Sequence, residues 1–219
     1  MTRLAVFDCD GTLADGQANI CLAMALAFAD AGLGEPDPRD VRRIVGLSLP
    51  QAVAALVPDS MPALHEAVAE GYKRHFRAMR SDGRLAEEPL FPGVVDALGA
   101  LLDGGWMLGV ATGKSDRGLS LLLTQHGLTR HFVTLQTADR HPSKPHPAML
   151  YAAMGEAGVR AERTVMIGDT GFDMAMAAAA GTRAIGVTWG YHGPDELVAA
   201  GADRLCDDAA TLPALLEQP

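Results

Sequence analysis

The sequence predicts an α/β protein: a doubly wound parallel sheet, with an all-helical second unit inserted after the first strand. Three observations lead to this expectation. Short apolar segments alternate with helical patterns, glycines fall where helices are expected to end, and one long interval contains helical patterns alone. The chain has 219 residues and is 48% hydrophobic, which is enough to bury a sizeable core.

Six segments are typical of strands that are covered on both faces, because they are apolar throughout rather than alternating. In chain order they are 4–8, 106–112, 132–136, 164–169, 184–189 and 204–208. The helical patterns that separate them lie at 93–103, 115–127, 146–157, 171–180 and 194–200. Strands that alternate with helices in this way predict a parallel sheet with helices on both faces.

One interval departs from this alternation, since only helices are indicated between Gly16 and Glu88. Prolines and glycines separate these helices, which we expect at 17–32, 38–45, 49–57 and 61–79. We therefore expect two domains: an α/β core made of residues 1–15 and 88–219, and a helical domain made of residues 16–87. The connecting stretches 14–16 and 86–91 are the candidate hinges.

Composition and charge exclude several classes of protein. The net charge of −9 and the absence of a Lys/Arg run argue against nucleic acid as a partner. The longest apolar run, 20–29, is half the length that a membrane span needs, so we expect no membrane association. The N-terminus leads directly into a strand without a secretory signal, and the three cysteines are scattered. These features predict a cytoplasmic protein with reduced thiols.

Polar side chains follow four of the predicted strands, where each strand ends. In an open parallel sheet, ligands bind outside the carboxyl ends of the strands, so these side chains are expected at one edge. The residues concerned are Asp8 and Asp10 after the first strand, Thr112, Gly113 and Lys114 after the second, Lys144 after the third, and Asp169 and Asp173 after the fourth.

The residue types in this set suit the binding and transfer of a phosphoryl group. Two carboxylates as close as Asp8 and Asp10 repel each other unless a cation lies near them. Together with Asp169 they supply the hard oxygen ligands that Mg²⁺ prefers. Lys144 adds a positive charge, and the Thr112 hydroxyl and Gly113 N–H add donors for phosphoryl oxygens.

The spacing of the two N-terminal aspartates suggests a division of roles. Asp8, at the tip of the strand, can act as a carboxylate nucleophile that takes the phosphoryl group covalently. Asp10 can protonate the leaving group and later deprotonate a water molecule. A free aspartate with a pKa near ~3.9 is a poor acid at neutral pH, so this role predicts a raised pKa for Asp10.

These residues resemble the four motifs of the haloacid dehalogenase superfamily: "DCDGTLAD" at 8–15, Thr112, Lys144 and "GDTGFD" at 168–173. The inserted helices resemble the C1-type cap of that superfamily, and the chain is most similar to its phosphoglycolate phosphatase-like branch. The resemblance implies that Asp8 is the nucleophile and Asp10 the acid and base. It also implies that Asp8, the Asp10 backbone carbonyl and Asp169 hold Mg²⁺. Thr112 and Lys144 would bind phosphate, and Asp173 would support the metal and Lys144.

The same resemblance leaves other activities open. Dehalogenases of the superfamily lack the second aspartate, so Asp10 favours phosphate chemistry. Phosphosugar mutases keep both aspartates, although they usually have Gly-Val where this chain has Gly11-Thr12. A receiver-like phospho-aspartate signalling module also uses an acidic pair, a threonine and a lysine. It needs no helical cap, however, and its phosphorylated aspartate follows a later strand.

Substrate specificity is less defined by the sequence. We expect a small phosphorylated metabolite as the partner, bound by a monomer or a dimer. In the predicted cap, Arg43 and Gly46 are candidate specificity residues, since a cap arginine can bind a carboxylate or phosphate. The segment 71–76 and Arg43 could equally belong to solvated helix faces. Lys114 could contact substrate or lie at the start of a helix.

Overall fold

The computed structural model describes residues 2–218 and contains a six-stranded parallel sheet in the order β3-β2-β1-β4-β5-β6. The predicted α/β fold class is confirmed, and each strand overlaps the segment expected for it. The strands are β1 (Arg3–Phe7), β2 (Trp106–Thr112), β3 (Phe132–Thr137), β4 (Thr164–Gly168), β5 (Arg183–Val187) and β6 (Arg204–Cys206).

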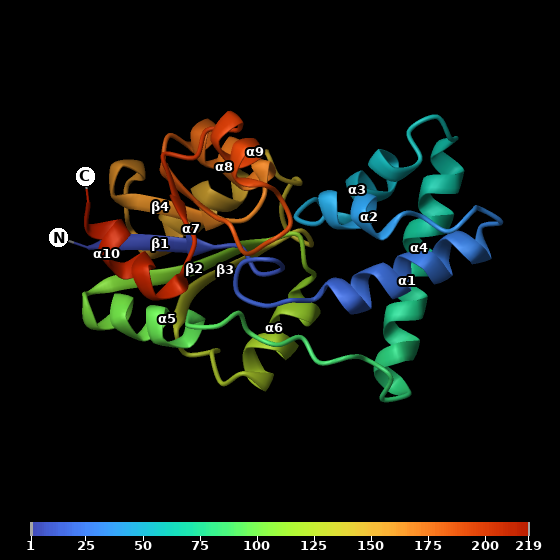
Figure 1. Cartoon of the computed structure of the whole chain (residues 1–219), viewed down its shortest axis with the longest axis horizontal. Helices are drawn as coiled ribbons and strands as arrows, with labels where there is room; N and C mark the ends of the chain where they lie inside the picture. The colour runs from blue at the N-terminus through green and yellow to red at the C-terminus, as the bar shows by residue number, and fades with distance from the viewer. Residues whose placement is uncertain (1, 219) are drawn as a thin grey trace.

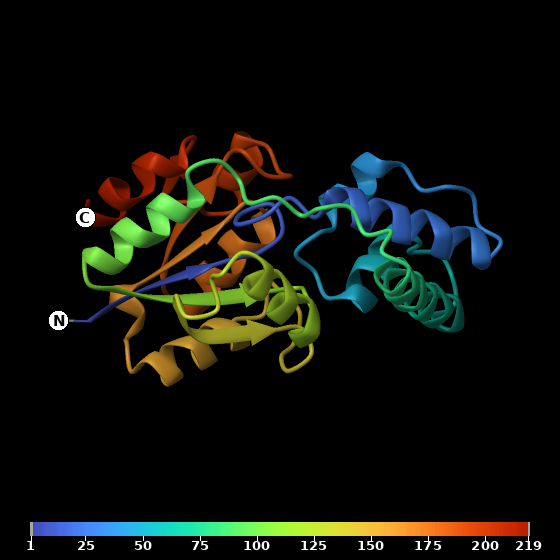
Figure 2. The ribbon, with the colours of Figure 1, turned by 90° about the horizontal axis from the view of Figure 1, so that it is seen from below.

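The strands are apolar throughout because both faces of the sheet are covered. In β1, Ala5 and Phe7 belong to one buried cluster, whereas Leu4 and Val6 belong to the cluster on the other face. The first cluster includes side chains from α5 (Val94–Asp103), α6 (Asp116–Gln125) and α10 (Leu212–Glu217). The second includes side chains from α7 (Ala148–Ala157), α8 (Gly171–Ala180) and α9 (Pro194–Ala199). Figure 2 shows the sheet between these helices.

Helix α10 was not predicted from the sequence. It is only six residues long, and its buried side chains are Leu212 and Leu216, so too few apolar positions repeat to indicate a helix. Two short 3₁₀ turns, Ala161–Arg163 and Ala209–Thr211, were not predicted either. None of these elements contains a candidate site residue.

Four helices form a separate group beyond the carboxyl ends of the strands, on the right in Figure 1. They are α1 (Gln17–Asp30), α2 (Pro38–Arg43), α3 (Leu49–Leu56) and α4 (Pro62–Ser81), and we refer to residues 17–81 as the helical block. The block has a buried apolar cluster of its own, which includes Met24, Phe28 and Val68. It lies within the interval predicted for the cap. The exact division into domains stays a prediction.

The two chain segments that connect the block to the sheet lie side by side. Asp15 N donates to Pro89 O at 2.9 Å, and Ala14 forms an antiparallel bridge with Leu90. The Asn19 side chain joins them further, because its amide donates to Ala86 O and accepts from Ala86 N, each at 2.9 Å. Movement of the block must therefore involve both segments together. Within residues 2–218, no helix combines the length and the apolar character needed to cross a membrane.

Helix α5 offers a test of the core. Leu98 is fully buried, whereas Leu102, one turn later, is 38% exposed. We expect Leu98→Ala to lower the free energy of unfolding by about 2–5 kcal/mol, since it leaves a cavity. Leu102→Ala should lower it by less than about 1 kcal/mol. Urea unfolding of both variants measures this difference. Equal losses would contradict the orientation of α5.

Candidate active site

The candidate site lies where the strand order of the sheet changes direction. Strand β1 pairs with β2 on one side and with β4 on the other, and ligands of open parallel sheets bind at such a switch point. Asp8 and Asp169 directly follow β1 and β4. The Asp8 backbone N–H donates to Ile167 O at 2.9 Å, which extends the pairing of the strands to the edge of the site.

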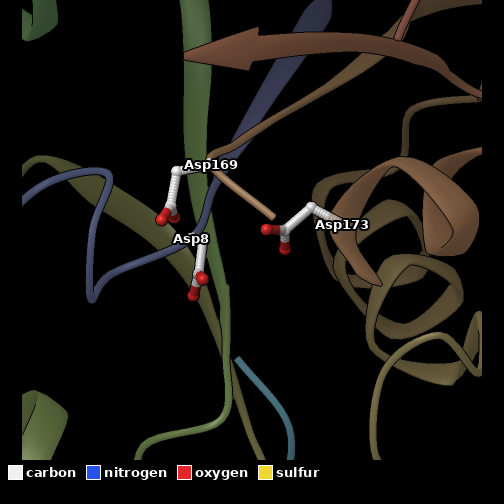
Figure 3. Close-up of side chains that lie close together, drawn as sticks. All are labelled: Asp8, Asp169 and Asp173. Carbon is white, nitrogen blue, oxygen red and sulfur yellow. The ribbon is translucent and has the colours of Figure 1, made fainter. Parts of the chain in front are cut away.

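Three buried carboxylates converge at this point: Asp8, Asp169 and Asp173 each offer an oxygen, and these oxygens lie within 4.8 Å of one another. Figure 3 shows the side chains arriving from three segments. Asp8 Oδ1 accepts from Cys9 N at 2.6 Å, whereas Asp8 Oδ2 is buried without a hydrogen-bond partner. A buried, unpaired carboxylate oxygen is costly, and hard oxygen ligands suit Mg²⁺. The site therefore fits a divalent cation.

Lys144 is the positive charge beside these carboxylates. Its side chain is fully buried, and Nζ lies 2.9 Å from Asp8 Oδ1 and 2.7 Å from Asp173 Oδ1. Burial lowers the pKa of Lys144, but the two carboxylates outweigh this effect, so its pKa is raised and the ammonium stays charged. The other Asp173 oxygen accepts from the Thr170 N–H and hydroxyl at the start of α8. Asp173 thus orients Lys144 from a helix N-terminus.

Asp169 is held by donors from two loops. The Thr12 hydroxyl donates to Oδ1 and the Tyr191 N–H donates to Oδ2, each at 2.9 Å. Two glycines leave room for this carboxylate: a Cβ on Gly11 would lie 2.1 Å from Asp169 Oδ2, and one on Gly190 would lie 2.2 Å from Asp169 Cβ. Burial and the neighbouring Asp8 charge raise the pKa of Asp169. Asp169 therefore also benefits from a nearby cation.

Asp10 is buried outside this group of three carboxylates. Its Oδ1 accepts from Lys114 Nζ at 2.7 Å, and Lys114 Nζ also lies 3.2 Å from Glu88 Oε2. Burial raises the pKa of Asp10, and the Lys114 charge opposes this rise. Sequence reasoning missed Glu88 and the contact between Lys114 and Asp10. Glu88 lies in a connecting segment, and no periodic pattern indicates which strand end that segment crosses.

Thr112 and Gly113 lie at the end of β2. The Thr112 hydroxyl is buried and accepts from Lys114 N at 3.2 Å. A Cβ on Gly113 would lie 2.6 Å from Leu47 O and 2.8 Å from Gly46 O, so the helical block contacts this end of the sheet directly. Gly46 has a φ of +101°, which favours glycine. The candidate specificity residue Gly46 thus lies over a candidate phosphate-binding residue.

Arg43 is placed differently from the other candidates. Its exposed guanidinium forms an ion pair with Glu196, and its carbonyl oxygen accepts from His192 Nε2 at 2.9 Å. It is not among the residues that line the cavity described next. Contact between Arg43 and a substrate gains no support from this arrangement. The ion pair of Arg43 with Glu196 instead connects the helical block to the core, as does the hydrogen bond from Ser48 N to Ser143 Oγ.

A cavity of about 1180 Å³ lies between the helical block and the core. At one end it is lined by Asp8, Asp10, Thr112, Gly113 and Lys114, and Gly46 lies on its wall. It continues between α4 and α6. The structure thus brings most of the sequence-predicted residues around one cavity, with Lys144, Asp169 and Asp173 behind Asp8.

Comparison with known proteins gives consistent matches along the chain. The sequence profile of the family described as "Haloacid dehalogenase-like hydrolase" matches residues 5–187. A protein of Dickeya dadantii named "Probable phosphatase IndB" is 38% identical, with 94% of this chain and 90% of that protein covered. A "Phosphoglycolate phosphatase" of Agrobacterium fabrum is 31% identical, with 100% and 94% covered. The crystal structure of a predicted phosphoglycolate phosphatase of Haemophilus somnus has a TM-score of 0.84 at 25% identity, covering 99% and 98%.

The glycine beside Asp169 provides a matched test of the site. Gly11 and Gly83 both have positive φ, but a Cβ on Gly83 would meet nothing within 4 Å. We expect Gly83→Ala to cost about 1 kcal/mol of stability through backbone strain alone. Gly11→Ala should cost more, and it should abolish the rise in melting temperature on addition of MgCl₂, because the methyl group displaces Asp169. Thermal unfolding with and without MgCl₂ measures both effects. An unchanged Mg²⁺ response in Gly11→Ala would contradict this geometry.

The pKa of Asp8 predicts how stability depends on pH. Burial raises this pKa to about 7, against an ordinary value of 3.8, and Lys144 only partly offsets the rise. The folded state therefore holds a proton on Asp8 that the unfolded state has lost, so in EDTA stability falls as the pH rises from 5 toward 8. The Asp8→Asn variant should show a shallower fall. An equal fall in the melting temperature of the two proteins between pH 5 and pH 8 would refute this effect.

Proposed function

Because this chain belongs to the haloacid dehalogenase-like hydrolases, we propose that it is a Mg²⁺-dependent phosphatase acting on small phosphomonoesters, such as phosphoglycolate, through an aspartyl-phosphate on Asp8. The observation that carries the proposal is the environment of Asp8: one oxygen is fixed by Lys144 and Cys9 N, and the other is buried without a partner. We also infer a cytoplasmic location, in agreement with three free cysteines.

Asp8 and Asp169 would hold Mg²⁺, with Asp173 close enough to support it. When bound, the cation would neutralise negative charge on the carboxylates and on the transferring phosphoryl group. The Asp10 backbone carbonyl, expected from the family as a further ligand, stays a prediction. Support for the set comes from the spacing of the three carboxylates and from the unpaired Asp8 oxygen.

In the first proposed step, an oxygen of the Asp8 carboxylate attacks phosphorus, and the bond between phosphorus and the ester oxygen breaks. Asp10 donates its proton to the departing alkoxide, which leaves as an alcohol. The raised pKa of Asp10, caused by its burial, supports a protonated form available for this transfer. The products of the step are the alcohol and a phosphorylated Asp8.

In the second step, a water molecule attacks the phosphorus of the aspartyl-phosphate while Asp10 accepts its proton. The bond between phosphorus and the Asp8 oxygen breaks, which restores the Asp8 carboxylate and releases inorganic phosphate. Lys144 would bind a phosphoryl oxygen from its position beside Asp8, and the Thr112 hydroxyl and Gly113 N–H would bind others. The helical block over Gly113 would limit access of bulk water.

Phosphate release tests this proposal. With MgCl₂ and a panel of phosphomonoesters that includes phosphoglycolate, the protein should release inorganic phosphate. The Asp8→Asn variant serves as the blank. Asp10→Asn should lose about 10²–10⁴-fold in kcat, the usual contribution of a general acid and base. Release no greater than the blank for every ester would refute the proposal, and an isomeric phosphate ester as sole product would favour the mutase alternative.

A further inference from the structure

The cavity extends well beyond the space that phosphoglycolate would fill. Its volume of about 1180 Å³ exceeds the roughly 300–1,000 Å³ of pockets that enclose drug-sized ligands. The part distant from Asp8 lies between the C-terminal half of α4 and helix α6, which are on the same side of the molecule in Figure 1. A substrate as short as phosphoglycolate would leave this part filled with water.

Four cationic side chains of α4 and α6 line the cavity. Lys73, Arg77 and Arg80 recur at helical spacing and so share one face of α4, and Arg117 lies on α6. Glu87, Glu88 and Asp139 line the cavity as well. Glu88 pairs with Lys114, so the four cations of the two helices outnumber the remaining acidic residues near them, Glu87 and Asp139. The local charge is therefore positive in a protein whose net charge is −9.

The guanidinium groups in this part have few partners of their own. Lys73 pairs with Glu70, and Arg77 Nε donates to the Lys73 carbonyl oxygen within the same helix. Arg80 lies over the Phe76 ring at 5.6 Å. Across residues 2–218, no carboxylate forms an ion pair with Arg77, Arg80 or Arg117. These three groups are therefore free to bind an anion from solution.

Apolar side chains line the cavity beside these arginines. Tyr72 and Phe76 lie on α4, and Leu121 lies on α6, where it is 44% exposed. An organic group that spans the cavity would cover these surfaces. Along α4 the order in the lining is thus Tyr72, Phe76 and then Arg80, whereas Arg117 lies in the first turn of α6, before Leu121.

From this order we infer the substrate class, on the basis of the proposed phosphatase function. The preferred substrates are phosphomonoesters whose organic part is longer than glycolate and carries a second anionic group, a carboxylate or another phosphate. Arg77, Arg80 and Arg117 bind this second anion, because a guanidinium matches either group with paired N–H donors. The scissile phosphate lies at Asp8, at the other end of the same cavity.

Matched pairs of esters test this inference. Glucose 6-phosphate and 6-phosphogluconate differ at the end remote from the phosphate, where the second carries a carboxylate. Fructose 6-phosphate and fructose 1,6-bisphosphate test a second phosphate in the same way. In each pair the anionic member should have a kcat/KM about tenfold higher, mainly through a lower KM, and the advantage should shrink at high salt. The two pairs show which of the two anions is preferred.

Variants then assign the preference to the arginines. Arg117→Ala and Arg80→Ala should reduce the ratio within each pair toward one, while kcat/KM for glucose 6-phosphate changes by less than about twofold. Arg74→Ala is the matched control, because Arg74 lies on α4 outside the cavity lining and pairs with Asp30. It should leave both ratios unchanged.

Three results would overturn the inference: ratios near one in the unaltered protein, ratios that persist in Arg117→Ala and Arg80→Ala, or phosphoglycolate as the best substrate. Failure of the proposed function is distinguishable from these, because then no ester, p-nitrophenyl phosphate included, would be hydrolysed above the Asp8→Asn blank.

Discussion

The repulsion among three buried carboxylates is the constraint on which the rest of the site depends. Asp8, Asp169 and Asp173 share a space in which the Lys144 ammonium contacts Asp8 and Asp173 directly. When all three are ionised, one ammonium leaves two negative charges uncompensated, which is the charge of one divalent cation. The glycines beside Asp169 and the donors from Thr12, Thr170 and Tyr191 hold the carboxylates in place. The fold thus maintains a site whose charge favours Mg²⁺.

The helical block is joined to this site through contacts that also involve the connecting segments. Gly46 and Leu47 lie against Gly113 at the end of β2. Lys114 contacts both Asp10 and Glu88, and Glu88 also accepts from the Asn19 amide at 3.2 Å. A displacement of the block would therefore change the surroundings of Asp10 as well as the access of water. This arrangement gives one physical route by which closure over a substrate would prepare Asp10 for its proposed role as acid and base.

Much of this arrangement follows from sequence. Continuous apolar runs indicate buried parallel strands, and parallel strands end at one edge, so the positions of Asp8, Thr112 and Asp169 were predictable. The contact of Lys114 with Glu88 was not, because it depends on how an irregular segment crosses that edge. Arg43 was a candidate either for contact with substrate or for a solvated helix face, and it pairs with Glu196 in a helix distant in sequence. Helix periodicity allowed residues 71–76 to face either solvent or substrate. In the structure, Tyr72, Lys73 and Phe76 of this segment line the cavity.

The proposed mechanism requires that Asp8 carries the phosphoryl group. The most direct test is acid quenching of the enzyme during turnover, followed by mass spectrometry of the peptide that contains Asp8. We expect a phosphoryl adduct on Asp8 in the unaltered enzyme, and none in Asp8→Asn. Release of phosphate at the normal rate without any adduct on Asp8, at quench times shorter than one turnover, would contradict it.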